Sequence, residues 1–226
     1  MDIMGKLVLL RHGESLWNKK NIFTGWVDIP LSETGVDEAV LAGDKIAHID
    51  FNVMYVSTLI RAQMTGFIAL AKCRGSKVPV FVSEHPHDWE KSYSNKEKEG
   101  MIPVYQSSAL NERYYGELQG KNKDEIKKEV GEVQFKLWRR SYDTPPPKGE
   151  SLKMTIERTM PYFKEKIIPH LDRGENVLIA AHGNSLRGIV MYLDNLSHDE
   201  VVHLEIPTGQ PILYHYDSGK WGKKSL

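Results

Sequence analysis

Two histidines follow apolar segments in nearly the same local sequence. The segments are KLVLLRHGES at 6–15 and NVLIAAHGNS at 176–185. Each predicts a buried strand that ends in His-Gly, so His12 and His182 both come directly after a strand. Imidazole is a good nucleophile toward phosphoryl groups, and glycine lets an anion approach the backbone amides. The repeated pattern predicts a phosphate-handling centre, but it does not say which histidine is the nucleophile.

Two arginines could supply positive charge to such a centre. Arg11 directly precedes His12. Arg61 falls in the first turn of a predicted helix, where the helix dipole disfavours a cation, and a residue that breaks a local rule tends to mark a functional site. The alternative for Arg61 is a surface position beside a carboxylate. Arg187 has a similar place after the second His-Gly; it could be an internal ion-pair partner, and we leave it out of the expected site.

The elements that must position these residues alternate between short apolar runs and helical periods. This pattern predicts an α/β fold with a mostly parallel central sheet flanked by helices on both faces. Ligands bind beyond the carboxyl ends of such strands, where His12 and His182 would lie. No linker interrupts the pattern, so we expect a single domain over 1–226. The expected strands cover 6–11, 53–57, 78–83, 176–182 and 211–216.

Helices are predicted from periodicity and capping signals. The main ones are expected over 59–72 and 123–142, and Pro161 should kink or divide a long amphipathic segment. Residues 84–106 are polar and aperiodic, which predicts an exposed loop. Four predicted helices have a capping residue; these are Thr34 in a box with Asp37, Ser57 or Thr58, Ser151, and Ser197 in a box with Glu200.

Composition argues against several classes of partner. Lys plus Arg equals Asp plus Glu, 30 of each, so no net charge attracts the chain to nucleic acid or to a membrane. The chain lacks a signal-peptide pattern and an apolar stretch of membrane-spanning length. Cys73 is the one cysteine, which precludes an internal disulfide and favours a reducing compartment, with a small buried thiol as its role. We expect a cytoplasmic protein, and we interpret HPHD at 85–88 as a solvated surface rather than a metal site.

Motifs along nearly the whole chain match one family in order. They include RHGES at 11–15, FTGW at 23–26, LNERYYGELQG at 110–120, AAHGNSLR at 180–187 and IPTGQP at 206–211. Together they resemble the histidine phosphatase superfamily, and more closely its cofactor-dependent phosphoglycerate mutases. The resemblance implies a phosphoglycerate mutase-like fold and interconversion of 3-phosphoglycerate and 2-phosphoglycerate through a phosphohistidine. It also implies 2,3-bisphosphoglycerate as primer and no metal, and it is compatible with a homodimer or a larger homo-oligomer.

The resemblance also implies roles for single residues. It makes His12 the phosphorylated nucleophile and Glu112 the general acid and base, with a pKa raised toward neutrality by burial and bound phosphates. His182 would stabilise the transferring phosphoryl group. The groups that grip this phosphoryl group would be Arg11, Arg61, Asn18 and the Gly183 amide. The other expected substrate contacts are Ser15, Thr24, Gly25, Tyr115, Lys123, Arg139, Arg140 and Asn184.

Other functions stay open. A phosphatase or a bisphosphoglycerate mutase would use the same histidines, although Ser15, Thr24 and Gly25 resemble the glycolytic pattern. A protein that only binds phosphorylated partners would need arginines but no acid-base Glu112. Relative to longer family members, 84–106 looks inserted, TPPPKGESL lacks a long segment before ESL, and the chain lacks an extended tail. A shorter tail admits more water, and for this reason we expect hydrolysis of the phosphoenzyme to compete with transfer.

Overall fold

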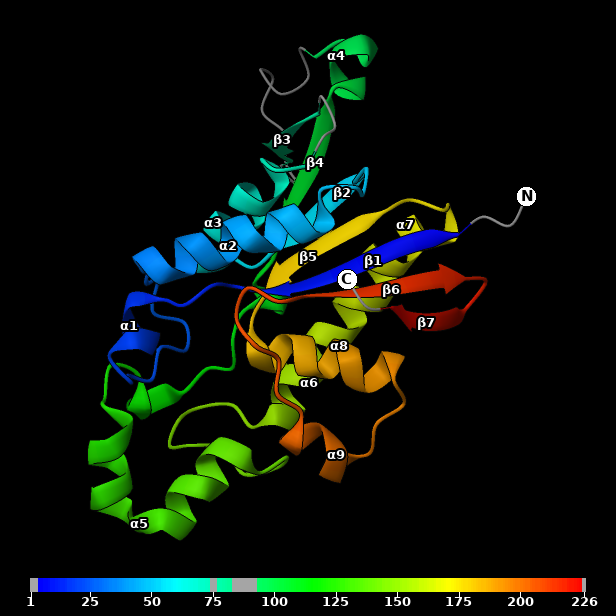
Figure 1. The fold of residues 1–226 in the computed structure, drawn as a ribbon. Helices are drawn as coiled ribbons and strands as arrows, with labels where there is room; N and C mark the ends of the chain where they lie inside the picture. The colour runs from blue at the N-terminus through cyan, green and yellow to red at the C-terminus, as the bar shows by residue number, and fades with distance from the viewer. Residues whose placement is uncertain (1–3, 74–76, 83–92, 225–226) are drawn as a thin grey trace.

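Seven strands form one sheet in the computed structural model of this chain, which describes residues 4–73, 77–82 and 93–224. The order across the sheet is β3-β4-β2-β5-β1-β6-β7 (Figure 1). All neighbours from β3 to β1 are parallel, whereas β6 is antiparallel to β1 and to β7. The mostly parallel sheet is therefore confirmed. The strands are β1 Gly5–Arg11, β2 Val53–Val56, β3 Val78–Phe81, β4 Met101–Gln106, β5 Val177–Ala181, β6 Pro211–Asp217 and β7 Lys220–Lys224.

Helices cover both faces of this sheet, as expected (Figure 1). Leu7 and Leu9 pack in one buried cluster with residues from α6 to α8, while Val8 and Leu10 pack in a second cluster with α2 and α3. Alternate side chains of a strand point to opposite faces, so β1 contributes to both cores. The helices are α1 Leu16–Lys19, α2 Glu33–Ile46, α3 Ile60–Leu70, α4 Asn95–Glu99, α5 Lys123–Arg140, α6 Leu152–Tyr162, α7 Ile168–Asp172, α8 Gly183–Leu193 and α9 His198–His203.

Two of the four predicted caps are wrong. The cap of α2 is Ser32, whose hydroxyl accepts from the Gly35 amide, so Thr34 already lies inside the helix. The cap residue of α3 is Leu59, which has no side-chain cap. The Ser57 hydroxyl contacts a histidine of the site described below and accepts from the Leu59 amide, which precedes the helix, and the Thr58 hydroxyl donates to the Asn111 side chain. The caps that are confirmed are Ser151 and the Ser197–Glu200 box.

The segment predicted as an exposed loop contributes a strand to the sheet instead. Strand β4 lies between β3 and β2, with Ile102 and Val104 buried. Pro103 concealed this strand in the sequence, because proline is rare in sheet interiors. Helix α4 precedes the strand. Residues 84–92 of the expected loop, including the histidines at 85–88, lie outside the described residues.

Two helical segments are less regular than their periodicity suggested. Helix α5 is broken at Gly131, where φ is 82° and ψ is 162°, and Figure 1 shows its two parts at an angle. Pro161 lies inside α6, and the segment changes only at Phe163, where a π-helical turn leads into α7. Cys73 lies just beyond α3, half-buried rather than fully buried, and burial raises the pKa of its thiol to about 11.

Candidate active site

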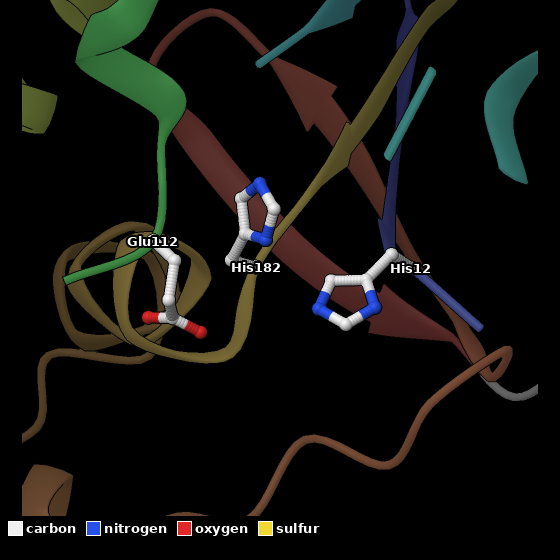
Figure 2. A group of neighbouring side chains, drawn as sticks. All are labelled: His12, Glu112 and His182. Atoms are coloured by element: carbon white, nitrogen blue, oxygen red, sulfur yellow. The ribbon is translucent and has the colours of Figure 1, made fainter. Parts of the chain in front are cut away.

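Strand register brings the two His-Gly segments together. Strands β1 and β5 are parallel neighbours, with Arg11 opposite Ala181, and the His12 amide donates to the Ala181 carbonyl at 3.0 Å. His12 and His182 are almost fully buried, and their ring centroids lie 4.9 Å apart. Glu112 reaches the same place from the loop after β4, and Figure 2 shows the three side chains converging. One ligand atom from each of the three lies within 4.8 Å of the others.

Hydrogen bonding determines which ring nitrogen of His12 carries the proton. Its Nδ1 lies 2.7 Å from the carbonyl oxygen of Gly13. Because a carbonyl only accepts, Nδ1 must carry the proton and Nε2 must hold the free lone pair. Burial, followed by the charges of Arg61 and Arg11, lowers the pKa of His12 well below its usual 6.5. His12 is therefore a neutral imidazole at pH 7, which is the form that attacks phosphorus.

His182 is also neutral but has a different environment. Its Nε2 lies 2.7 Å from the hydroxyl oxygen of Ser57, whereas its Nδ1 is buried without a hydrogen-bond partner. Burial lowers the pKa of His182 well below 6.5, and the charges of Arg61 and Arg11 lower it further. The unpartnered Nδ1 can pair with a ligand, which fits a neighbour that stabilises a transferring group.

Two arginines, Arg61 buried and Arg11 partly buried, leave donors for an anion. Arg61 is 1% exposed and donates to the carbonyls of Val27 and Gly25 at 3.0 and 2.7 Å. Burial lowers its pKa to about 10, so it stays charged at pH 7. Arg11 donates to the Ile206 carbonyl at 2.7 Å. The Nε of each arginine is buried without a partner. The surface ion pair considered for Arg61 is therefore wrong, because its guanidinium lies inside the protein.

The two glycines after the histidines have different roles. A Cβ on Gly13 would lie 2.2 Å from the Gly35 carbonyl oxygen, so glycine is required for packing against α2. The Gly13 amide donates to the Thr65 hydroxyl at 3.0 Å, and the expectation that it points at an anion is wrong. Gly183 begins α8 and lines the pocket, where a Cβ would meet Arg11 only at 3.6 Å. Of the two glycines, only Gly183 both begins a helix and lines the pocket.

Glu112 is held as an ionised carboxylate. Its Oε1 accepts from the Arg113 amide at 2.8 Å and from the backbone and side-chain amides of Asn184 at 3.2 and 2.7 Å. Burial raises the pKa of Glu112, but these hydrogen bonds and the charges of Arg11 and Arg61 outweigh burial and leave it below the usual value. In the ligand-free protein burial therefore does not raise the pKa of Glu112 above its usual value, and the rise expected from bound phosphates stays a prediction.

Cations dominate the pocket beside these residues. Two carboxylates, Glu112 and Glu205, oppose six cationic side chains. The cationic lining residues are Arg11, Arg61, Lys123, Arg139, Arg140 and Arg187. The neutral lining residues that the sequence also predicted are Asn18, Thr24, Gly25, Tyr115, Gly183 and Asn184. Such a lining is suited to a small molecule with more than one anionic group.

A model of the histidine phosphatase superfamily (branch 1) matches residues 7–90 and 92–226. The chain belongs to the histidine phosphatase superfamily. The superfamily expected from the motifs is thereby confirmed. The match covers every residue of the site, from Arg11 to Ile206.

Relatives of this histidine phosphatase superfamily member share most of its length. A 2,3-bisphosphoglycerate-dependent phosphoglycerate mutase of Chlamydia trachomatis is 54% identical over 220 residues, which are 97% of each chain. A 2,3-bisphosphoglycerate-dependent phosphoglycerate mutase 1 of Arabidopsis thaliana is 53% identical over 96% of this chain and 66% of its own. Among solved structures, YhfR of Bacillus stearothermophilus has a TM-score of 0.76 at 25% identity, covering 97% of this chain and 95% of its own.

Two predicted site residues of this superfamily member, Ser15 and the fully buried His182, lie outside the pocket lining. Ser15 is fully buried and caps α1, and its hydroxyl donates to the Asn18 side chain at 2.9 Å. It therefore orients Asn18, which does line the pocket. Arg187, which we left out, lines the pocket and donates to the Leu204 carbonyl and to the Asn184 side chain.

Sequence reasoning also missed the group that holds the Glu112 loop. Arg158 of α6 donates to four backbone carbonyls between 108 and 112. The distance is 2.9 Å to the carbonyl of Glu112 itself and 3.0–3.2 Å to the other three. It also forms an ion pair with Glu150 at 2.8 Å. The Trp26 indole donates to the same Glu112 carbonyl, and its ring packs against the Arg158 guanidinium. A glutamate eight residues before an arginine is too common a pattern to have indicated this.

The same cluster could in principle offer a metal two nitrogens and a carboxylate. However, Arg11 and Arg61 lie close enough to lower the pKa of both histidines, and two guanidinium groups oppose a bound cation.

Within the described ranges, no helix is both long and apolar enough to cross a membrane.

Proposed function

We propose that this protein is a 2,3-bisphosphoglycerate-dependent phosphoglycerate mutase that interconverts 3-phosphoglycerate and 2-phosphoglycerate through a phosphohistidine. The observation that carries the proposal is a neutral His12 with its Nε2 lone pair free, beside Glu112 and His182, in a strongly cationic pocket. The names of relatives at 54% and 53% identity support the same activity.

His12 is the nucleophile in this reaction. Its Nε2 attacks the phosphorus of the substrate, a P–N bond forms, and the bond from phosphorus to the leaving oxygen breaks. The proton stays on Nδ1, because Nδ1–H donates a hydrogen bond to the Gly13 carbonyl. The phosphorylated ring is therefore held in one orientation while the substrate turns or exchanges.

His182, Arg11 and Arg61 stabilise the phosphoryl group as it moves. Phosphoryl transfer requires little covalent chemistry from the protein, so positioned charge supplies most of the rate. The unpartnered Nε–H groups of the two arginines are buried donors that a phosphoryl oxygen can accept from. When the Ser57 hydroxyl donates to Nε2 of His182, the ring proton lies on Nδ1, which becomes a third such donor. These groups need not reorganise during the reaction, which is what makes such stabilisation effective.

Glu112 moves the proton that the transfer requires. It protonates the leaving oxygen as the P–O bond breaks, and it later removes the proton of the hydroxyl that attacks phosphohistidine. Arg11 and Arg61 contribute to its lowered pKa in the free protein. Substrate phosphate neutralises these charges, so binding raises the proton affinity of Glu112 toward the value that an acid needs.

The residues present also fit the primer. Three buried polar atoms of the pocket have no partner, namely Arg11 Nε, Arg61 Nε and Thr24 Oγ1. Lys123, Arg139 and Arg140 lie around the same pocket and would hold the carboxylate and the second phosphate of a bisphosphoglycerate. When bound, 2,3-bisphosphoglycerate supplies the phosphoryl group that first loads His12.

The proposal extends to the surroundings of this activity. The protein acts in glycolysis and gluconeogenesis in the cytoplasm, needs no metal and has no nucleic-acid or membrane partner, and the proposal is compatible with a homodimer or a larger homo-oligomer. Residues 1–226 act as one domain.

The test is conversion of 3-phosphoglycerate to 2-phosphoglycerate by dephosphorylated protein in EDTA, with trace 2,3-bisphosphoglycerate added or withheld. His12→Ala is the variant, and His48→Ala, at an exposed position, is its matched control. We expect conversion that needs the bisphosphate, survives EDTA and is lost only in His12→Ala. Phosphate release without isomerisation would instead indicate a phosphatase, and no turnover would indicate a protein that only binds phosphorylated molecules.

A further inference from the structure

One carboxylate of the cationic pocket has no part in the reaction outlined above. Glu205 lies between α9 and β6 and lines the pocket. Its Oε1 is 2.6 Å from an Nη of Arg140, at the end of α5, and its Oε2 is 3.5 Å from an Nη of Arg187, on α8. Three separate elements thus meet in one ion-pair group. Its carboxylate is not part of the His12, His182 and Glu112 cluster.

The position of Glu205 is unusual for a site that takes anions. A negative side chain in such a pocket repels the ligand and occupies cations that would otherwise bind it. Hydrogen bonding and charge from Arg140, with further charge from Arg187 and Arg11, outweigh burial and hold the pKa of Glu205 below its usual value. Glu205 is therefore charged at neutral pH, when substrate binds.

Glu205 presents to Arg140 and Arg187 the same kind of anionic group that a ligand would present. A carboxylate with one oxygen on each guanidinium resembles a bound carboxylate or phosphate of a substrate. The Glu205 side chain is 61% exposed, whereas that of Arg187 is 11% exposed. Glu205 can therefore move away into water while the arginine stays in place. Ion pairs that face water contribute little stability, so this displacement is inexpensive.

We propose that Glu205 is a specificity-determining residue, an internal competitor that occupies Arg140 and Arg187 until the substrate group that is not being transferred displaces it. The inference rests on the proposed mutase function, in which Arg140 holds that group. It implies that Glu205 weakens binding of all anionic ligands. The effect is larger for 2,3-bisphosphoglycerate than for the monophosphates, because the repulsion grows with ligand charge.

The test compares Glu205→Gln with the unaltered protein. Glutamine keeps the size and a hydrogen-bond acceptor but removes the charge. Glu157→Gln removes an exposed carboxylate of α6 outside the pocket lining and serves as the matched control. Glu205→Asp is a second variant, which keeps the charge but is too short for the 2.6 Å contact with Arg140.

Binding is measured by calorimetry in the His12→Ala background, where no phosphoryl transfer interferes, with 3-phosphoglycerate, 2,3-bisphosphoglycerate and inorganic phosphate as ligands. We expect Glu205→Gln to tighten 3-phosphoglycerate binding about fivefold, the factor for one unit charge about 4 Å away in water, and to tighten bisphosphate binding more. Glu205→Asp should give a smaller gain, and Glu157→Gln should give none. In otherwise unaltered protein, Glu205→Gln should lower KM by a similar factor.

Weaker binding in Glu205→Gln would overturn the inference, because it would mean that Glu205 orients the two arginines for the ligand. Unchanged binding would overturn it as well. A thermal melt of each variant shows whether the fold is intact, and Glu205→Asp provides the comparison if glutamine is not tolerated. Failure of the proposed function would appear separately, as absence of isomerisation by the unaltered protein, while the phosphate titrations would still report on Glu205.

Discussion

Asn184 donates both its backbone amide and its side-chain amide to the same carboxylate oxygen of Glu112, at 3.2 and 2.7 Å. This double contact links the first turn of α8 to the loop that carries Glu112. Because a hydrogen bond to the ionised form stabilises it, Asn184 lowers the proton affinity of Glu112. The start of the helix after His182 thus helps to set the protonation state of Glu112, the proposed acid-base residue.

We expect Asn184→Ala to raise the pKa of Glu112, since the side-chain donor is lost. Carbon-13 NMR titration of glutamate side chains measures this, with Glu112→Gln to assign the signal. The pKa of Glu112 is lower in the folded protein than in the unfolded chain, where it is about 4.3. Ionised Glu112 therefore stabilises the fold at a pH above 4.3, and this stabilisation is lost as the pH falls through the pKa of the folded protein. The loss of unfolding free energy in Asn184→Ala should therefore be larger at pH 7 than at pH 3. An unshifted Glu112 signal would contradict this account.

Arg158→Lys should slow proton transfer more than phosphoryl transfer. Lysine keeps the charge but cannot reach four carbonyls at once, so the Glu112 loop loses its fixed position. A displacement of about 1 Å can cost up to about 100-fold in rate. We expect a loss of that order in kcat for 3-phosphoglycerate, with KM little changed. Phosphorylation of His12 by an aryl phosphate with a good leaving group needs no acid and should fall much less.

Arg173→Lys is the matched control for that experiment, because Arg173 is an exposed arginine paired with Glu175. It should leave both rates unchanged. An equal loss of both rates in Arg158→Lys would mean that Arg158 supports the fold in general rather than the position of Glu112.

Gly13→Ala should destabilise the protein, whereas Gly183→Ala should not. The new Cβ at position 13 would lie 2.2 Å from a backbone oxygen of Gly35, and relieving such overpacking costs about 1–3 kcal/mol. At position 183 the nearest atom outside the chain neighbours lies at 3.6 Å, an ordinary contact. Urea unfolding of both variants checks the difference. Equal stability of the two would mean that the loop before α1 shifts freely.

Ser32→Ala should cost about 0.5–2 kcal/mol of unfolding free energy, the usual loss for a helix cap. The Ser32 hydroxyl also donates to the Glu14 carboxylate at 2.7 Å, which places the loss toward the upper end. Thr34→Ala is the natural control, because Thr34 is exposed and lies inside α2. Thermal or chemical unfolding measures both. A larger loss in Thr34→Ala would restore the capping box that the sequence alone suggested.

Features encoded by neighbouring residues could be predicted from the sequence. The strands before His12 and His182 are continuous apolar runs, and Ser151 and Ser197 act on amides three residues away, so local spacing was enough for each. Strand β4 was missed because its pairing with β2 and β3 outweighs the local signal of Pro103.

The sequence by itself determined that two buried strands end in His-Gly and that the surrounding motifs belong to one superfamily, because strand periodicity and motif order are properties of adjacent residues. Only the tertiary structure decided which nitrogen of His12 is free, that Glu112 is ionised, and that Glu205 faces Arg140 and Arg187. Proton affinity and ion pairing depend on burial and on charges a few ångströms away, and most of those charges come from residues distant in the chain.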